Sequence, residues 1–119
     1  MQVLIVQNQT DLAKLWGRYF ERRGATEHLV EDQERAVAVL NTSDVRVIIL
    51  TLALDKGSAL AVADYASYRR PDARVIFVNN SAFFSDGSIF THCANARVMM
   101  PEDTEPEDLT AVVEHYAVN

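Results

Sequence analysis

The amino-acid sequence predicts an α/β fold, a three-layer (βα)5 doubly wound parallel sheet that forms a single domain over residues 1–119. The run Val45–Leu54, VRVIILTLAL, is rich in Val and Ile and apolar on both faces. Such a run is typical of a central parallel strand that helices cover on each side. Strand-length apolar runs also alternate with helical periodicity along the whole chain, which is the pattern of repeated βα units.

The first half of the chain contains two strand–helix units. Gln2–Val6 is a short apolar run that suits a buried strand, and Thr26–Glu31 suits a more exposed one. Between them we predict a helix that Thr10 caps and Gly24 ends, with an apolar stripe of Leu12, Leu15, Trp16, Tyr19 and Phe20. Asp32 is placed to cap a second helix, with inward residues Ala36, Val37 and Leu40.

The second half continues the alternation after the central strand. Ser58 is placed to cap a helix that ends before Pro71 and buries Leu60, Val62, Ala63 and Ala66. Two further strands are predicted over Ala73–Val78 and Ala96–Met100. The stretch Asn79–Cys93 indicates only a turn and a helix of one or two turns.

The last helix begins with a predicted capping box of Thr104 and Glu107, and its buried stripe consists of Leu109, Val112, Val113 and Tyr116. Five βα units in 119 residues fit a flavodoxin-like sheet with strand order 2-1-3-4-5. In open α/β sheets ligands bind outside the carboxyl ends of the strands, so this edge is where we expect a functional site.

Composition narrows the function classes. Eleven basic and 17 acidic residues give a net charge of −6, which disfavours binding to a nucleic-acid backbone. The single cysteine, Cys93, excludes an internal disulfide and favours a reducing compartment. Neither a signal-peptide core nor a run of 18 apolar residues is present, so we expect a cytoplasmic chain without membrane contact. Cys93 and the histidines do not have metal-site spacing either.

Three segments carry a resemblance to a known family. VLIVQNQ, VIILTLALDKGSAL and ARVMMPEDTEPEDL resemble the first, third and fifth strands, with their loops, of receiver domains from bacterial two-component response regulators. In that family, two carboxylates after the first strand and an acceptor aspartate hold Mg²⁺, a Ser or Thr ends the fourth strand, and a lysine ends the fifth. The resemblance implies a place in two-component signalling or a phosphorelay.

All five of these functional positions are changed in this chain. The residues found there are Gln7 and Asn8 for the acidic pair, Thr51 for the acceptor, Asn79 for the hydroxyl and Met100 for the lysine. Two amides and a hydroxyl provide no charge to attract Mg²⁺, and Met100 cannot replace a cation. We therefore expect no cofactor, no metal and no enzymatic activity, and interpret the chain as a stand-alone pseudo-receiver that acts by binding protein.

An alternative from a different class is an atypical phosphoacceptor that uses Asp55 or Thr51. Asp55 is the carboxylate nearest to the expected pocket in the sequence, whereas Thr51 is a poor nucleophile without a base to activate it. A phosphoryl adduct on either residue would favour this alternative.

The expected partners are signalling proteins: a histidine kinase, a phosphotransfer protein or a regulator. Phe83, Phe84 and Phe90 are the candidate anchors, because large aromatic side chains in an irregular segment make strong interface contacts. Arg97 occupies the family's aromatic switch position on the fifth strand and is a further interaction candidate. We expect any homodimer to be weak and salt-sensitive, because surface ion pairs contribute little.

Overall fold

A computed structural model of the chain describes residues 1–79 and 93–117. Five parallel strands form one sheet in the order β2-β1-β3-β4-β5, which confirms the predicted topology. The strands are β1 (Gln2–Val6), β2 (Thr26–Val30), β3 (Val47–Thr51), β4 (Arg74–Asn79) and β5 (Ala96–Pro101). The described helices are α1 (Thr10–Arg22), α2 (Gln33–Thr42), α3 (Ala59–Arg69) and α5 (Pro106–Ala117).

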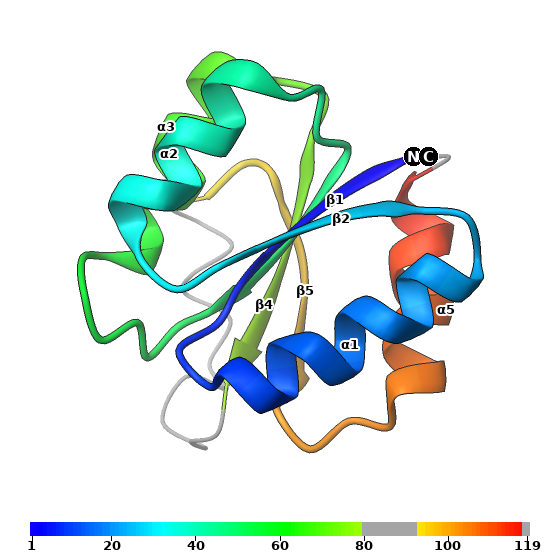
Figure 1. Ribbon diagram of the computed structural model, residues 1–119. Helices are drawn as coiled ribbons and strands as arrows, with labels where there is room; N and C mark the ends of the chain where they lie inside the picture. Colours follow the sequence, from blue (N-terminus) through cyan, green and yellow to red (C-terminus); the bar gives the residue numbers. More distant parts are fainter. Residues whose placement is uncertain (80–92, 118–119) are drawn as a thin grey trace.

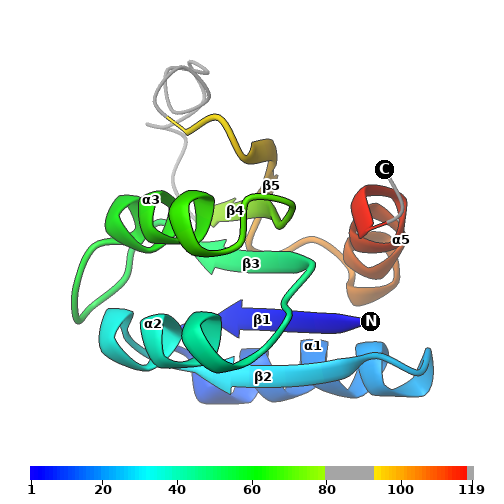
Figure 2. The same ribbon diagram turned by 90° about the horizontal axis from the view of Figure 1, so that it is seen from above.

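Helices cover both faces of the sheet (Figure 1). α2 and α3 lie side by side on one face, and α1 and α5 cover the other, as the view from above shows (Figure 2). Each face has its own apolar core, and the sheet separates the two cores. This is the predicted three-layer arrangement.

The central strand β3 contributes side chains to both cores. All five of its residues are buried. Ile48 and Leu50 belong to the core under α2 and α3, whereas Val47 and Ile49 belong to the core under α1 and α5. The strand is shorter than the predicted run Val45–Leu54, because its pairing with β4 ends at Thr51 and the chain then turns into a loop.

The sequence pattern also located α1 and β2 correctly. Trp16 and Phe20 of α1 are buried in the core that α1 shares with α5. α1 ends before Gly24, whose φ of 82° is a conformation that glycine adopts without strain. β2 lies at the edge of the sheet and is partly exposed, as its more polar composition predicted.

Two of the predicted helix caps are confirmed. The Asp32 carboxylate accepts a hydrogen bond from the backbone N–H of Arg35 (2.8 Å), and the Ser58 hydroxyl accepts one from Ala61 (3.2 Å). These bonds satisfy N–H groups that a helix leaves unpaired in its first turn.

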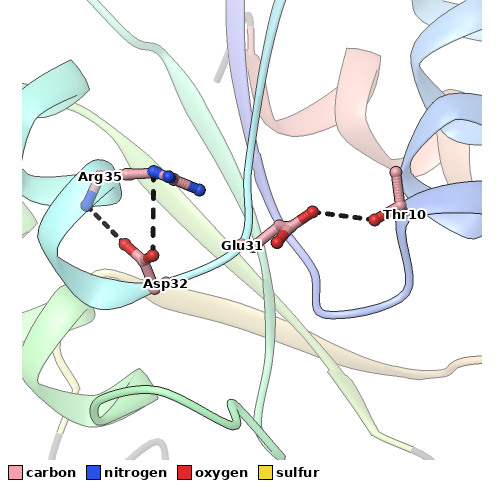
Figure 3. A network of polar contacts seen from close by, with 4 residues as sticks. All are labelled: Thr10, Glu31, Asp32 and Arg35. Carbon is pink, nitrogen blue, oxygen red and sulfur yellow. Dashed lines mark hydrogen bonds and ion pairs between the residues drawn. The ribbon is translucent and has the colours of Figure 1, made fainter.

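The predicted caps at Thr10 and Thr104 are wrong. Thr10 is already the first residue of α1, and its hydroxyl donates to the Glu31 carboxylate (2.8 Å), as Figure 3 shows. α5 begins only at Pro106, whose fixed φ suits the first helical position, and the Thr104 hydroxyl donates to the carbonyl of Pro101 (2.6 Å). In both places another acceptor engages the hydroxyl.

The predicted inward position of Leu60 is also wrong, because its side chain is 46% exposed. The buried stripe of α3 consists of Ala59, Val62, Ala63 and Ala66. Leu60 is rotated by about 100° from Ala59 around the helix axis and therefore points away from the sheet. In α2, Val37 is only half-buried.

The predicted turn and short helix between Asn79 and Cys93 fall on residues 80–92, outside the described part of the chain. Within the described ranges, none of the helices has the length and apolar character needed to cross a membrane.

Candidate functional site

The five candidate site residues lie at the carboxyl ends of four neighbouring strands. Gln7 and Asn8 directly follow β1, Thr51 ends β3, Asn79 ends β4, and Met100 is the penultimate residue of β5. The strand register pairs Val6 with Leu50, Thr51 with Val78, and Asn79 with Pro101. The fold therefore brings together at one edge the polar residues that the sequence placed there.

Gln7, which directly follows β1, is buried, with 1% of its surface exposed. Its Oε1 accepts a hydrogen bond from the backbone N–H of Gln9 (3.1 Å), which fixes the orientation of the amide. The buried Nε2 then has no acceptor among the described residues. An unpaired buried amide N–H2 is a poor neighbour for a cation, because it directs its positive hydrogens into the space available.

The other strand ends add buried neutral groups. Thr51 is 1% exposed and Asn79 is 7% exposed. Met100 is half-buried and packs against the core under α1 and α5. These residues supply a hydroxyl, an amide and a thioether, and none of them carries a formal charge.

Asn8 connects the loop after β1 to the loop after β3. Its Nδ2 donates to the carbonyl oxygen of Ala53 (2.6 Å), and its Oδ1 accepts from the backbone N–H of Asp55 (2.9 Å). Exchanging the two amide atoms would place acceptor against acceptor and donor against donor, so the contacts define the orientation. A carboxylate at this position could accept from Asp55, but it could not donate to Ala53.

The same loop is held from its other side by Gln33, the first residue of α2. The Gln33 side-chain oxygen accepts from the backbone N–H of Ser58 (2.8 Å), and the backbone N–H of Gln33 donates to the carbonyl of Lys56 (3.1 Å). Gly57 between them has a φ of 104°, and a Cβ at this position would lie 2.4 Å from the Gln33 Cβ. The loop from Leu52 to Ser58 is thus fixed between Asn8 and Gln33.

The donor set at this edge does not fit the Mg²⁺ ion that the resemblance implies. Mg²⁺ requires oxygen ligands and is usually held through carboxylates. Here the Ala53 carbonyl already accepts from the Asn8 amide, and the Gln7 Nε2 adds a second N–H2 group. The exposed carboxylate of Asp55 is in the loop that Asn8 holds, and it is the acidic side chain closest in sequence to Thr51.

A polar contact also links the loops after β1 and β5, because the side-chain amide of Gln9 donates to the Glu102 carboxylate. Neither Gln9 nor Gln33 was recognised from the sequence as part of this region. A polar residue at a strand end or a helix start is common, and its partner lies far away in the sequence, so no local pattern marks it.

Arg97, one of the four interaction candidates, is not part of this edge. Arg97 is the second residue of β5, near the opposite end of the strand from Pro101, and is exposed. Its guanidinium donates to the carbonyls of Ala94 (2.8 Å) and Ala96 (3.2 Å). Phe83, Phe84 and Phe90 lie outside the described residues, so their role stays a prediction.

Cys93 is buried and free, in agreement with a packed rather than a reactive thiol. Burial raises the pKa of this thiol, and the negative charge of Asp64 adds to the effect. Among the described residues, no group of three His, Cys, Asp or Glu side chains is arranged to hold a metal ion.

Comparison with known sequences gives no family: no family model and no curated protein matches the chain. Solved structures are more informative. A CheY-like response regulator receiver domain protein from Methanospirillum hungatei superposes with a TM-score of 0.88 at 18% identity, covering 98% of this chain and 93% of that one. The receiver domain of the Francisella response regulator 1452 gives 0.84 at 14% identity, covering 98% and 96%.

A third similar structure, NtrX from Brucella abortus, is much longer. It matches with a TM-score of 0.88 and 18% identity over 98% of this chain, but over only 27% of its own length. Identities this low establish the fold alone. From the strand order, the layers and these superpositions, we conclude that the chain has the fold of response regulator receiver domains.

Proposed function

We propose that this chain is a pseudo-receiver: a cytoplasmic signalling domain that is not phosphorylated and acts through protein–protein interaction. Its partners are signalling proteins, such as a histidine kinase, a phosphotransfer protein or a regulator. The contact of Asn8 with Ala53 and Asp55 carries the proposal, because a side-chain amide joins the two loops where receivers hold a metal ion.

The chemistry of the edge supports this proposal in two ways. Phosphoryl transfer depends on cations that neutralise the developing negative charge, and Gln7, Asn8, Thr51 and Met100 provide none and do not attract one. The loop from Leu52 to Ser58 is also held without a metal, by Asn8 on one side and Gln33 on the other.

Metal binding tests the proposal directly. We expect isothermal titration calorimetry with MgCl₂ to give no binding heat for the wild-type chain. The variant Gln7→Asp/Asn8→Asp/Thr51→Asp places three carboxylates at the same edge and serves as the positive control, because carboxylates are the groups that hold Mg²⁺. Saturable Mg²⁺ binding by the wild type that is lost in Asp55→Asn would contradict the proposal.

The interaction half of the proposal needs a separate measurement. We expect the tagged chain to retain the same partner from its source cells whether or not Asp55 is replaced by Asn, as identified by mass spectrometry. If partner capture required Asp55 and a phosphoryl donor, the atypical phosphoacceptor would be the better account.

A further inference from the structure

Charge is distributed unevenly between the two ends of the strands. Five of the 11 basic residues lie at the amino edge of β3, β4 and β5, although the chain as a whole has a net charge of −6. We call this set the arginine edge; its members are Arg46, Arg69, Arg70, Arg74 and Arg97. Two carboxylates lie within two residues of these arginines in the sequence: Asp44 precedes Arg46, and Asp72 lies between Arg70 and Arg74.

Backbone contacts place these arginines close to one another. Arg74 donates its N–H to the carbonyl of Arg46 (3.0 Å), so the starts of β3 and β4 are adjacent. β5 begins beside β4, because Ala96 pairs with Val75. The backbone carbonyl of Arg70 accepts a hydrogen bond from the backbone N–H of Ala73 (2.9 Å), which connects the end of α3 to the same edge. Neighbouring strands lie about 4.8 Å apart, so the three strand starts span about 10 Å.

In the part of the chain that the structure describes, no carboxylate forms an ion pair with an arginine of this edge. Within residues 1–79 and 93–117 the ion pairs are Arg23–Glu114 and Arg35–Asp32, and neither includes an edge arginine. The guanidinium groups are nevertheless oriented, because backbone carbonyls hold four of them. The donor–acceptor pairs are Arg69 to Asn41, Arg70 to Leu40, Arg74 to Asp72, and Arg97 to Ala94.

Helix dipoles explain only part of this pattern. Arg69 and Arg70 bind the carbonyls of Asn41 and Leu40 at the end of α2, where a cation is favourable. Arg46, Arg74 and Arg97 precede or begin strands, and a strand has only a small dipole to compensate. Their charge therefore remains available to an anionic surface.

The opposite end of the sheet, at the carboxyl ends of the strands, presents such a surface. Glu102, Asp103, Glu105, Glu107 and Asp108 lie between the carboxyl end of β5 and the first turn of α5, and we call them the acidic edge. The parallel sheet separates the two edges, because every strand runs from the arginine end to the acidic end. One molecule thus carries two complementary surfaces that cannot reach each other.

We propose that the arginine edge binds the acidic edge of a second copy, giving a weak head-to-tail association. A contact of this kind uses two different surfaces, so each added copy leaves one of each free and the assembly does not close. Guanidinium groups that are already oriented lose little freedom on pairing with carboxylates. The inference does not depend on the proposed function, since neither edge includes Gln7, Asn8 or Thr51.

Sedimentation equilibrium over a range of protein concentrations tests this association. At about 20 mM salt we expect the weight-average mass to rise with concentration past twice the 13.3 kDa monomer mass. At about 300 mM salt it should return to the monomer, because the contact is made of exposed charges. A monomer at all concentrations in low salt, or a plateau at twice the monomer mass, would overturn the proposal.

Charge-reversal variants test whether the arginine edge and the acidic edge form the contact. Arg46→Glu and Glu105→Lys should each weaken association about fivefold, the scale of an exposed ion pair. Arg18→Glu and Glu21→Lys on α1 change the net charge by the same amounts and should have no such effect. An equimolar mixture of Arg46→Glu and Glu105→Lys contains one intact pair of edges and should form 1:1 pairs. If the α1 controls weaken association equally, or the mixture recovers nothing, the edges are not the contact.

Discussion

The side chain of Asn8 donates a hydrogen bond of 2.6 Å to the carbonyl oxygen of Ala53, 45 residues away in the sequence. This bond joins two loops at the carboxyl edge of the sheet, and the second bond, from the N–H of Asp55 to Asn8, makes the connection two-sided. The amide supplies both a donor and an acceptor, which a carboxylate cannot do. The two contacts together therefore require an amide rather than a carboxylate at position 8.

Replacing Asn8 by Asp should lower the free energy of unfolding by about 1–2 kcal/mol, because the donor is lost and an anionic oxygen faces the Ala53 carbonyl. Denaturant unfolding at neutral pH measures the effect. Asn41→Asp is the matched control: within the described ranges the Asn41 side chain contributes only its Oδ1, as the acceptor for the Tyr65 hydroxyl, and an aspartate retains this acceptor. Equal stability losses in both variants would show that the Ala53 contact is not the cause.

A substitution at Gly57 tests the contact between Gln33 and the loop from Leu52 to Ser58. Gly57→Ala should cost about 2–3 kcal/mol of stability, because it combines an unfavourable positive φ with a Cβ 2.4 Å from that of Gln33. Gly24→Ala has a φ of 82° but nothing within 4 Å, so it should cost only about 1 kcal/mol. Comparison of their thermal unfolding isolates the contact with Gln33; a Gly57 variant no worse than the Gly24 variant would argue against it.

Alanine substitution of Phe83 and Phe84 distinguishes an interface role from a core role for these residues. Phe83→Ala and Phe84→Ala should leave the melting temperature nearly unchanged and weaken partner binding if these residues are surface anchors. Phe77→Ala is the reference for a core residue, since Phe77 is fully buried, and should cost about 3–5 kcal/mol. A loss of that size in both Phe83→Ala and Phe84→Ala would place the partner surface elsewhere.

The thiol of Cys93 should react slowly in the native protein. Burial raises its pKa and reduces the thiolate fraction, so a colorimetric thiol reagent should react more than about tenfold faster after unfolding than before. Because the folded pKa is the higher one, the unfolded chain loses its proton first as the pH rises. Stability from this group should therefore decrease above the ordinary pKa of a cysteine, and Cys93→Ala should remove that decrease.

The sequence was sufficient for most of the fold and for the prediction that the candidate residues lie at one edge of the sheet. Periodicity located the buried strand around Ile48 and Ile49, and the apolar stripe of α1 through Trp16 and Phe20. These signals are local, because a side chain that faces the core repeats at a fixed spacing. The place of the site followed from the resemblance and from the general rule for parallel sheets.

What the sequence did not reveal depends on contacts between distant residues. Threonine is a common helix cap, but the Thr10 hydroxyl donates a hydrogen bond to the Glu31 carboxylate, which only the folded chain brings near. Leu60 is apolar, but the neighbouring stripe of α3 is filled by smaller residues and leaves it outside. The roles of Asn8 and Gln33 likewise require knowing which loops meet.

Phosphorylation itself provides the most direct test of a silent receiver site. After incubation with acetyl phosphate and MgCl₂, we expect intact-mass spectrometry to show the wild-type chain unchanged, because Gln7, Asn8, Thr51 and Met100 provide neither a metal site nor a carboxylate acceptor. The variant Gln7→Asp/Asn8→Asp/Thr51→Asp/Met100→Lys introduces the residue types that receiver domains carry at these positions and controls for the donor. An adduct of about 80 Da on the wild type, mapped to Asp55 or Thr51, would contradict the account.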